Sequence, residues 1–210
     1  MKRIILFGAP GSGKGTQAEK IENEFGYMKI STGDLIRDEV SKKSDIGNKI
    51  EDTIKSGNLI SDEIIIDIVK KKINGKDITS GYIMDGFPRT LFQAEALSKV
   101  EVEKEIPIFL KVNDDMVVKR ITSRLFCKTC GKIYNKKFNP PKKRCVCDNC
   151  GEVLSERTDD SEEIIKKRIH VYRKETMPVI EFYKQKGNLR EIDAVGEIND
   201  IYSVVRDIIK

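Results

Sequence analysis

The stretch ILFGAPGSGKGTQ, residues 5–17, restricts the fold of this chain more than any other feature. Gly8, Gly13 and Lys14 have the G-x4-G-K spacing of a phosphate-binding loop, between an apolar run and a segment with helical periodicity. Glycines let backbone N–H groups converge on phosphate oxygens, and the helix N-terminus adds partial positive charge. We therefore predict that a nucleoside triphosphate binds here, with Lys14 neutralising its phosphates. The alternative is a glycine-rich turn with an incidental lysine.

Short apolar runs alternate along the chain with longer segments of helical periodicity. The runs cover residues 4–7, 28–30, 82–84, 106–112 and 189–192. The helical segments include residues 17–25, 64–73, 116–125, 164–183 and 198–209. The stretches STGD, SDEI and DDSEE are typical of helix starts. This alternation predicts an α/β fold, a parallel sheet of the P-loop NTPase type flanked by helices.

Composition narrows the class of protein. The chain has 210 residues, of which 39% are hydrophobic and 35% charged, with a net charge of +5. These values favour a folded domain over a disordered chain. No apolar run approaches the roughly 18 residues of a membrane helix, and no signal-peptide cleavage site follows the first apolar run. We therefore expect a cytoplasmic protein with no membrane partner.

All five cysteines lie in one segment without long helical periodicity. The pairs Cys127-x2-Cys130 and Cys147-x2-Cys150 are sixteen residues apart, and a glycine follows each pair. This is the spacing of a four-cysteine zinc site. Because four thiolates leave no position for water, we predict a structural Zn²⁺. Two alternatives stay open here, a disulfide pair and the replacement of Cys147 by Cys145.

Three motifs together indicate a known family. The chain resembles long-form adenylate kinases with an enlarged lid. The motifs that carry the resemblance are, in this order, GAPGSGKGT at residues 8–16, STGDLIR at 31–37 and DGFPRT at 85–90. The resemblance extends from Lys2 to about residue 193, and the last helix matches only loosely. The loop departs from the usual G-x4-G-K-[ST] pattern because Gly15 follows the lysine and the hydroxyl comes at Thr16.

The resemblance implies three structural units and a reaction. The core P-loop domain would cover residues 1–30, 61–125 and 160–210, an AMP-binding insert residues 31–60, and a zinc-binding lid residues 126–159. The implied activity is reversible phosphoryl transfer from ATP to AMP, giving two ADP, with Mg²⁺.

The resemblance also implies the ATP site. Its residues would be Gly11, Ser12, Gly13, Lys14, Gly15, Thr16, Arg120, Arg124, Ile133, Tyr134 and Gly196, with both arginines on the helix that enters the lid. Asp85 ends the apolar run YIMD, where a carboxylate would hold hydrated Mg²⁺. The alternative role for Asp85 is a cap of the following turn.

The AMP site is implied in the same way. Its residues would be Thr32, Arg37, Asn58, Leu59, Ile60, Gly86, Phe87, Pro88, Arg89, Gln93, Arg157 and Arg168. The amide of Gln93 presents a donor beside an acceptor, which suits adenine. However, TLFQ is also a capping-box pattern, in which Gln93 would bond to the backbone of Thr90.

Cations should surround the transferring phosphoryl group, because catalysis of this reaction is mostly positioning and electrostatic stabilisation. The expected catalytic residues are Lys14, Arg89, Arg124, Arg157 and Arg168. A nucleotide phosphate is already ionised at neutral pH, so no general base is needed. We therefore expect the lone histidine, His170, on a solvated helix face.

Two other functions stay open from the sequence. One is a kinase for another nucleoside monophosphate, UMP or CMP, although such relatives typically have short lids without cysteines. The other is a zinc-ribbon nucleic-acid-binding protein, suggested by the basic run KKFNPPKKR at residues 136–144. We expect ATP, AMP and ADP as ligands, no nucleic acid partner, and a monomer.

Overall fold

The computed structural model describes residues 1–75, 78 and 80–210, and its main sheet is parallel. The strands of this sheet lie in the order β2-β3-β1-β4-β8. Their bounds are β1 (Lys2–Phe7), β2 (Met28–Ser31), β3 (Gly81–Asp85), β4 (Lys104–Lys111) and β8 (Arg190–Asp193). The predicted α/β fold is therefore confirmed.

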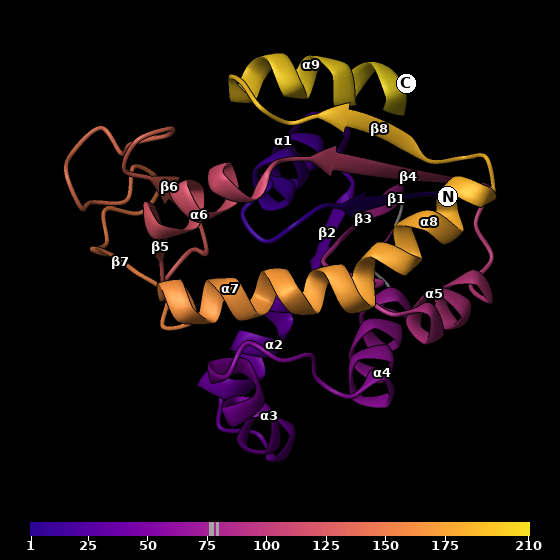
Figure 1. The fold of residues 1–210 in the computed structure, drawn as a ribbon, viewed down its shortest axis with the longest axis horizontal. Helices are drawn as coiled ribbons and strands as arrows, with labels where there is room; N and C mark the ends of the chain where they lie inside the picture. Colours follow the sequence, from indigo (N-terminus) through magenta and orange to yellow (C-terminus); the bar gives the residue numbers. More distant parts are fainter. Residues whose placement is uncertain (76–77, 79) are drawn as a thin grey trace.

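Helices cover both faces of this sheet (Figure 1). The core helices are α1 (Lys14–Phe25), α4 (Asp62–Ile73), α5 (Leu91–Ser98), α6 (Asp114–Thr122), α7 (Glu162–Val171), α8 (Met177–Gln185) and α9 (Ile198–Ile209). Successive side chains of a strand point to opposite faces. Accordingly, Ile4 and Leu6 of β1 pack with α1 and α9. Ile5 and Phe7 pack with α4, α5 and α8. A strand buried on both faces in this way positions the loop that follows it.

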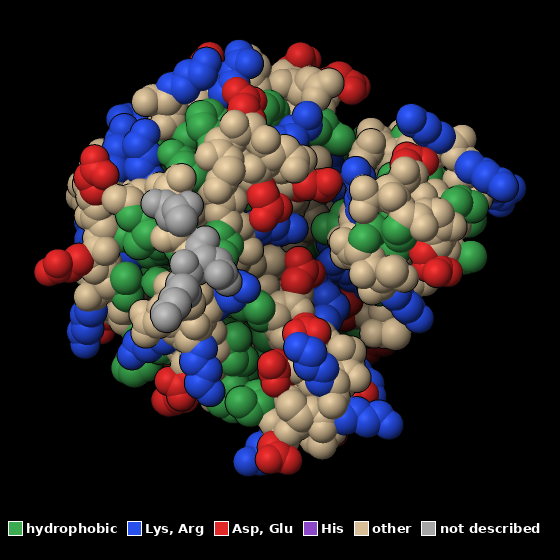
Figure 2. All heavy atoms as spheres, turned by 180° about the vertical axis from the view of Figure 1, so that it is seen from behind, with side chains coloured by type: hydrophobic (Ala, Val, Ile, Leu, Met, Phe, Trp, Pro, Cys, Tyr) green, Lys and Arg blue, Asp and Glu red, His purple; other side chains and the backbone are tan. Residues whose placement is uncertain are grey.

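Two smaller parts project from this core. Helices α2 (Thr32–Ser41) and α3 (Asp45–Lys55) form one, here called the α2–α3 lobe. The other contains β5 (Arg124–Cys127), β6 (Ile133–Asn135) and β7 (Leu154–Ser155), an antiparallel sheet in the order β6-β5-β7, here called the lid. Figure 2 shows both parts standing out from the main body, with a hollow between them. Their assignment as domains, with the boundaries given above, stays a prediction.

Two predicted helices differ from the structure. The helix expected at residues 116–125 ends at Thr122, and β5 begins at Arg124. Val117, Ile121 and Leu125 keep a four-residue spacing that imitates a helix, but Leu125 belongs to the separate small core of the lid. The helix expected at residues 164–183 is divided into α7, a π-helical turn (Tyr172–Thr176) and α8. Pro178 has no N–H to donate, so regular bonding cannot continue through this point.

No helix of the described residues has both the length and the apolar character needed to cross a membrane.

Candidate active site

A cavity of about 310 Å³ lies beside the carboxyl ends of β1 and β3, where ligands bind in open parallel sheets. Every residue expected to bind ATP or AMP lines this cavity, and so does Asp85. Its walls come from the phosphate loop, the α2–α3 lobe, the lid and α7. The cavity therefore brings together segments that are far apart in the sequence.

The phosphate loop wraps the start of α1. The ammonium of Lys14 donates to the carbonyl oxygens of Gly8 and Ala9, at 2.8 Å and 2.9 Å, and lies 3.4 Å from the hydroxyl of Ser12. A Cβ on Gly8 would lie 2.4 Å from the Ser12 hydroxyl, so this tight turn requires glycine. The bonds to Gly8 and Ala9 hold the Lys14 side chain against the backbone of the loop.

Gly15 departs from the usual pattern of the loop and lies close to both Asp85 and the lid. A Cβ at this position would lie 3.4 Å from Oδ2 of Asp85 and 3.4 Å from Cδ1 of Ile133. Both distances are ordinary van der Waals contacts, so this position lies between the Asp85 carboxylate and the lid. With glycine at this position, the first hydroxyl after Lys14 in the sequence is that of Thr16.

Buried cations gather in the cavity. Burial, opposed by Asp85 and aided by repulsion from nearby arginines, lowers the pKa of Lys14 to about 8. Burial, followed by repulsion from Arg168, lowers the pKa of Arg89 to about 10, so its guanidinium stays charged at neutral pH. The Nε of Arg157 is buried and has no hydrogen-bond partner among the described residues. A buried cationic N–H group without a hydrogen-bond partner favours an anionic ligand.

Asp159 and Asp160, which the sequence predicts only as residues at a helix start, bind the guanidinium groups of two arginines in the cavity. Asp160 accepts hydrogen bonds from both Nε and Nη2 of Arg124, the first at 2.8 Å. Nη1 of Arg168 lies 2.9 Å from Oδ2 of Asp159 and 3.1 Å from Oδ1 of Asp160. Burial opposes ionisation of Asp159, but Arg168 and neighbouring arginines keep its pKa below the ordinary value. The bond between Asp160 and Arg124 joins residues 36 positions apart, so the sequence alone did not indicate that Asp160 binds an arginine.

Three expected ATP-site residues need further description. Arg124 lies on β5 and not on the helix before it, which corrects the expectation given above. Arg120 does lie on α6, where its guanidinium donates to the carbonyls of Ser12 and Ala194. Tyr134 is 2% exposed, and its hydroxyl lies 3.5 Å from Sγ of Cys147, so its side chain faces the interior of the lid.

Gln93 lines the cavity and is 2% exposed. Thr90 is the N-cap of α5 and accepts a hydrogen bond from the Gln93 N–H at 3.2 Å. The side chain of Gln93 does not return to Thr90 as in a capping box, because its Oε1 accepts from the Arg89 N–H at 2.8 Å. His170 is exposed on α7, as expected.

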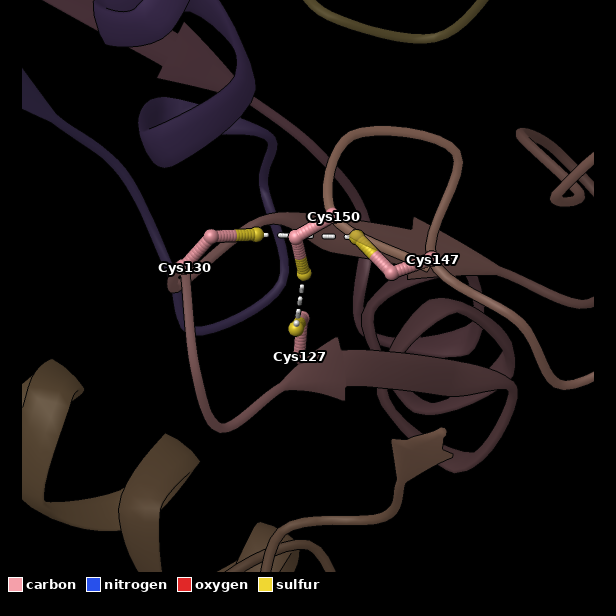
Figure 3. A group of neighbouring side chains, drawn as sticks. All are labelled: Cys127, Cys130, Cys147 and Cys150. Carbon is pink, nitrogen blue, oxygen red and sulfur yellow. Dashed lines mark hydrogen bonds between the residues drawn. The ribbon is translucent and has the colours of Figure 1, made fainter. Parts of the chain in front are cut away.

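Four cysteine side chains converge in the lid (Figure 3). The sulfur atoms of Cys127, Cys130, Cys147 and Cys150 all lie within 4.8 Å of one another. The shortest separations are 3.4 Å and 3.5 Å, too long for a disulfide bond of about 2.05 Å. Four sulfurs each about 2.3 Å from a tetrahedral Zn²⁺ would lie about 3.8 Å apart. Cys145 is exposed and outside this group.

The environment of this cluster suits a metal. Burial opposes ionisation of Cys147, but hydrogen bonds from Tyr134 and from backbone N–H groups lower its pKa to about 6. The Tyr134 oxygen accepts from the Asp148 N–H at 2.8 Å, which leaves its own proton for the sulfur. Because metal ligands must be thiolates, the surroundings of Cys147 are compatible with metal binding.

A phosphate loop, a ring of buried cations and two projecting parts around one cavity define a P-loop phosphotransferase that acts on nucleotides. The sequence model of the family "Adenylate kinase" matches residues 6–188. The chain is 42% identical to the adenylate kinase of Caldicellulosiruptor saccharolyticus, over 99% of this chain and 97% of the relative. It is 41% identical to the adenylate kinase of Methanosarcina barkeri, over 99% and 98% of the two chains. It is 42% identical to that of Thermosipho melanesiensis, over 99% of each chain.

The chain therefore belongs to the adenylate kinase family and is a nucleoside monophosphate kinase. None of these findings favours a kinase for UMP or CMP, or a nucleic-acid-binding protein.

Proposed function

We propose that this chain transfers the γ-phosphoryl group of ATP reversibly to AMP, giving two ADP, inside the 310 Å³ cavity. The observation that carries the proposal is the convergence of five cations from separate elements in that cavity: Lys14, Arg89, Arg124, Arg157 and Arg168. Charge spreads over the oxygens of the phosphoryl group during transfer, so such a ring lowers the barrier by electrostatic stabilisation. An AMP phosphate needs no general base.

ATP would bind at the side of the phosphate loop. The backbone N–H groups of residues 11–16 and the Lys14 ammonium would hold its phosphates at the N-terminus of α1. The part of the cavity between α6, the lid and the segment before α9 is lined by Arg120, Ile133, Tyr134 and Gly196. These residues would contact the rest of the nucleotide, Tyr134 through its backbone.

AMP would bind at the side of the α2–α3 lobe. Thr32, Arg37 and Arg89 would contact its phosphate, while residues 58–60 and Gln93 would surround the adenine. Gly86 has φ +79°, and a Cβ there would lie 2.8 Å from the Arg89 guanidinium and 3.0 Å from the Thr32 hydroxyl. Glycine thus leaves room for these two groups to meet the same phosphate. Arg157 and Arg168 would complete the site and stabilise the transferring group.

Two metal ions fit this proposal. Mg²⁺ bound to the phosphates would neutralise charge during transfer, and Asp85 would hold it through water. Structural Zn²⁺ would be bound by Cys127, Cys130, Cys147 and Cys150. We further propose that the protein acts as a cytoplasmic monomer and that its lid closes over ATP, which would exclude water from the reaction.

The choice of acceptor tests the proposal directly. Incubation with ATP and Mg²⁺, and with AMP, UMP, CMP or GMP in separate reactions, should form ADP rapidly with AMP alone. The reason is that the amide of Gln93 complements the donor and acceptor of adenine and not the reversed order of guanine and uracil. Cytosine has the same order as adenine, so CMP tests whether the site also requires the size of a purine. Equal or faster ADP formation with UMP or CMP would show that the acceptor site is assigned wrongly.

The lowered pKa of Lys14 predicts proton uptake when ATP binds. A bound phosphate favours the ammonium form and raises the pKa from about 8, so we expect proton uptake and falling ATP affinity as pH rises from about 8 to 10.

The effect of pH on folding without ligand has the opposite sign to its effect on ATP affinity. The unfolded chain holds more protons between about pH 8 and 10.5, so this group makes the free energy of unfolding rise with pH there.

Calorimetric titration with ATP at about pH 9, in two buffers of different ionisation enthalpy, measures this uptake. Lys14→Met should abolish it. Identical heats in both buffers for the unchanged protein would contradict the prediction.

A further inference from the structure

Asp62 lies directly behind Gln93, outside the cavity lining. It is the first residue of α4 and is half-buried. Its Oδ1 accepts from Nε2 of Gln93 at 2.7 Å, and its Oδ2 accepts from the hydroxyl of Thr90 at 2.9 Å. Neither bond caps α4, the helix to which Asp62 belongs. Asp62 thus joins the start of α4 to the start of α5.

The oxygen and the nitrogen of the Gln93 amide each bond to a group that cannot change between donor and acceptor. An ionised carboxylate only accepts hydrogen bonds, so Nε2 must face Asp62. A backbone N–H only donates, so Oε1 must face Arg89. Reversing the amide would place two acceptors together on one side and two donors together on the other.

The backbone of Arg89 is itself fixed. Its carbonyl accepts from the hydroxyl of Thr176, in the π-helical turn, at 3.1 Å. Its side-chain Nε donates to the carbonyl of Gly86 at 2.7 Å. The N–H that holds Oε1 of Gln93 therefore cannot swing away to permit a reversed amide.

After these bonds are made, Gln93 has one N–H donor and one acceptor lone pair left. A Gln amide in one orientation matches the donor and acceptor of adenine. The 6-oxo purines, hypoxanthine and guanine, carry an acceptor at position 6 and a donor at N1, which is the reverse order. A freely rotating amide could turn over and accept them, whereas a held amide cannot.

We infer that Asp62 is a positioning residue for base selection, which holds the Gln93 amide in the orientation that accepts AMP and rejects 6-oxo purine monophosphates. The inference rests on the proposed contact of Gln93 with adenine. Asp62 touches no substrate and acts through Gln93, so its effect should fall on specificity and not on phosphoryl transfer.

The test compares AMP with IMP as acceptors for the full-length enzyme. Asp62→Asn keeps the shape of the side chain but lets it donate as well as accept, which removes one of the two contacts that oppose a reversed amide. Because the mismatch at residue 62, one of the two that oppose the reversed amide, is then removed, we expect the IMP-to-AMP ratio of kcat/KM to rise about tenfold. The KM for AMP should rise and the KM for ATP should stay unchanged. Asp67→Asn, on the exposed face of the same helix, is the matched control and should leave the ratio unaltered.

A double-mutant cycle separates the outcomes. In the Gln93→Ala background, Asp62→Asn should no longer change the IMP-to-AMP ratio. If Gln93→Ala leaves the KM for AMP unaltered, the proposed adenine site fails. If Gln93→Ala raises that KM but Asp62→Asn lowers only the melting temperature, with an unchanged ratio, the inference alone is overturned. Should Asp62→Asn fail to fold, Asp62→Ser also removes the carboxylate that opposes a reversed amide. An unchanged AMP-to-IMP binding ratio of this variant, measured by calorimetry, would equally overturn the inference.

Discussion

Lys14→Met should lower turnover by about 10²-fold or more while the fold stays intact. Methionine keeps most of the length of the side chain but removes its ammonium, and the backbone amides of the phosphate loop stay in place. The lost interaction is strongest when charge spreads over the transferring group, so kcat should fall more than affinity for ATP. Steady-state kinetics with saturating AMP measure both effects.

Lys119→Met is the matched control for this change. Lys119 is exposed on α6 and does not line the cavity, so its replacement should leave kcat unaltered. The fold of Lys14→Met can be checked by circular dichroism and thermal unfolding, since no large loss of apolar packing accompanies the change. A folded Lys14→Met protein with normal turnover would refute the role proposed for the phosphate loop.

Removal of the proposed lid Zn²⁺ should have the second large effect. The buried hydrophobic cluster of the lid holds only Leu125, Cys127, Tyr134, Cys147 and Leu154, so the lid has little apolar packing of its own. Because binding energy at a four-cysteine site becomes folding energy, chelation or Cys130→Ser should lower the melting temperature by about 10 °C. Limited proteolysis should then cut within the lid first.

The fifth cysteine provides an internal control. Cys147→Ser should release zinc, because its sulfur belongs to the cluster. Cys145→Ser should keep one equivalent, because Cys145 is exposed and outside the cluster. Elemental analysis of the two purified variants distinguishes them. Zinc retained by Cys147→Ser but lost from Cys145→Ser would mean that the ligand set is wrong, and no zinc in the unaltered protein would end the zinc proposal.

Local features were predictable from the sequence because they depend on residues close together in the chain. The phosphate loop is one, since the positions of Gly8, Gly13 and Lys14 are set within a single turn between β1 and α1. The two C-x2-C turns are another. The residues expected around both nucleotides all line one cavity, although their individual roles stay predictions. That expectation came from the resemblance to a family and not from periodicity.

The tertiary structure decided what depends on contacts between distant segments. Leu125 continues a helical spacing in the sequence, but it is buried in the lid, so a strand replaces the end of the helix there. Asp160 looked like a helix-start residue, and only folding brings it to Arg124, 36 residues earlier. Asp62 and Gln93, 31 residues apart, meet in the same way. Hydrogen bonds such as these form between segments that are distant in the sequence, and neither local spacing nor composition predicts which distant segments come into contact.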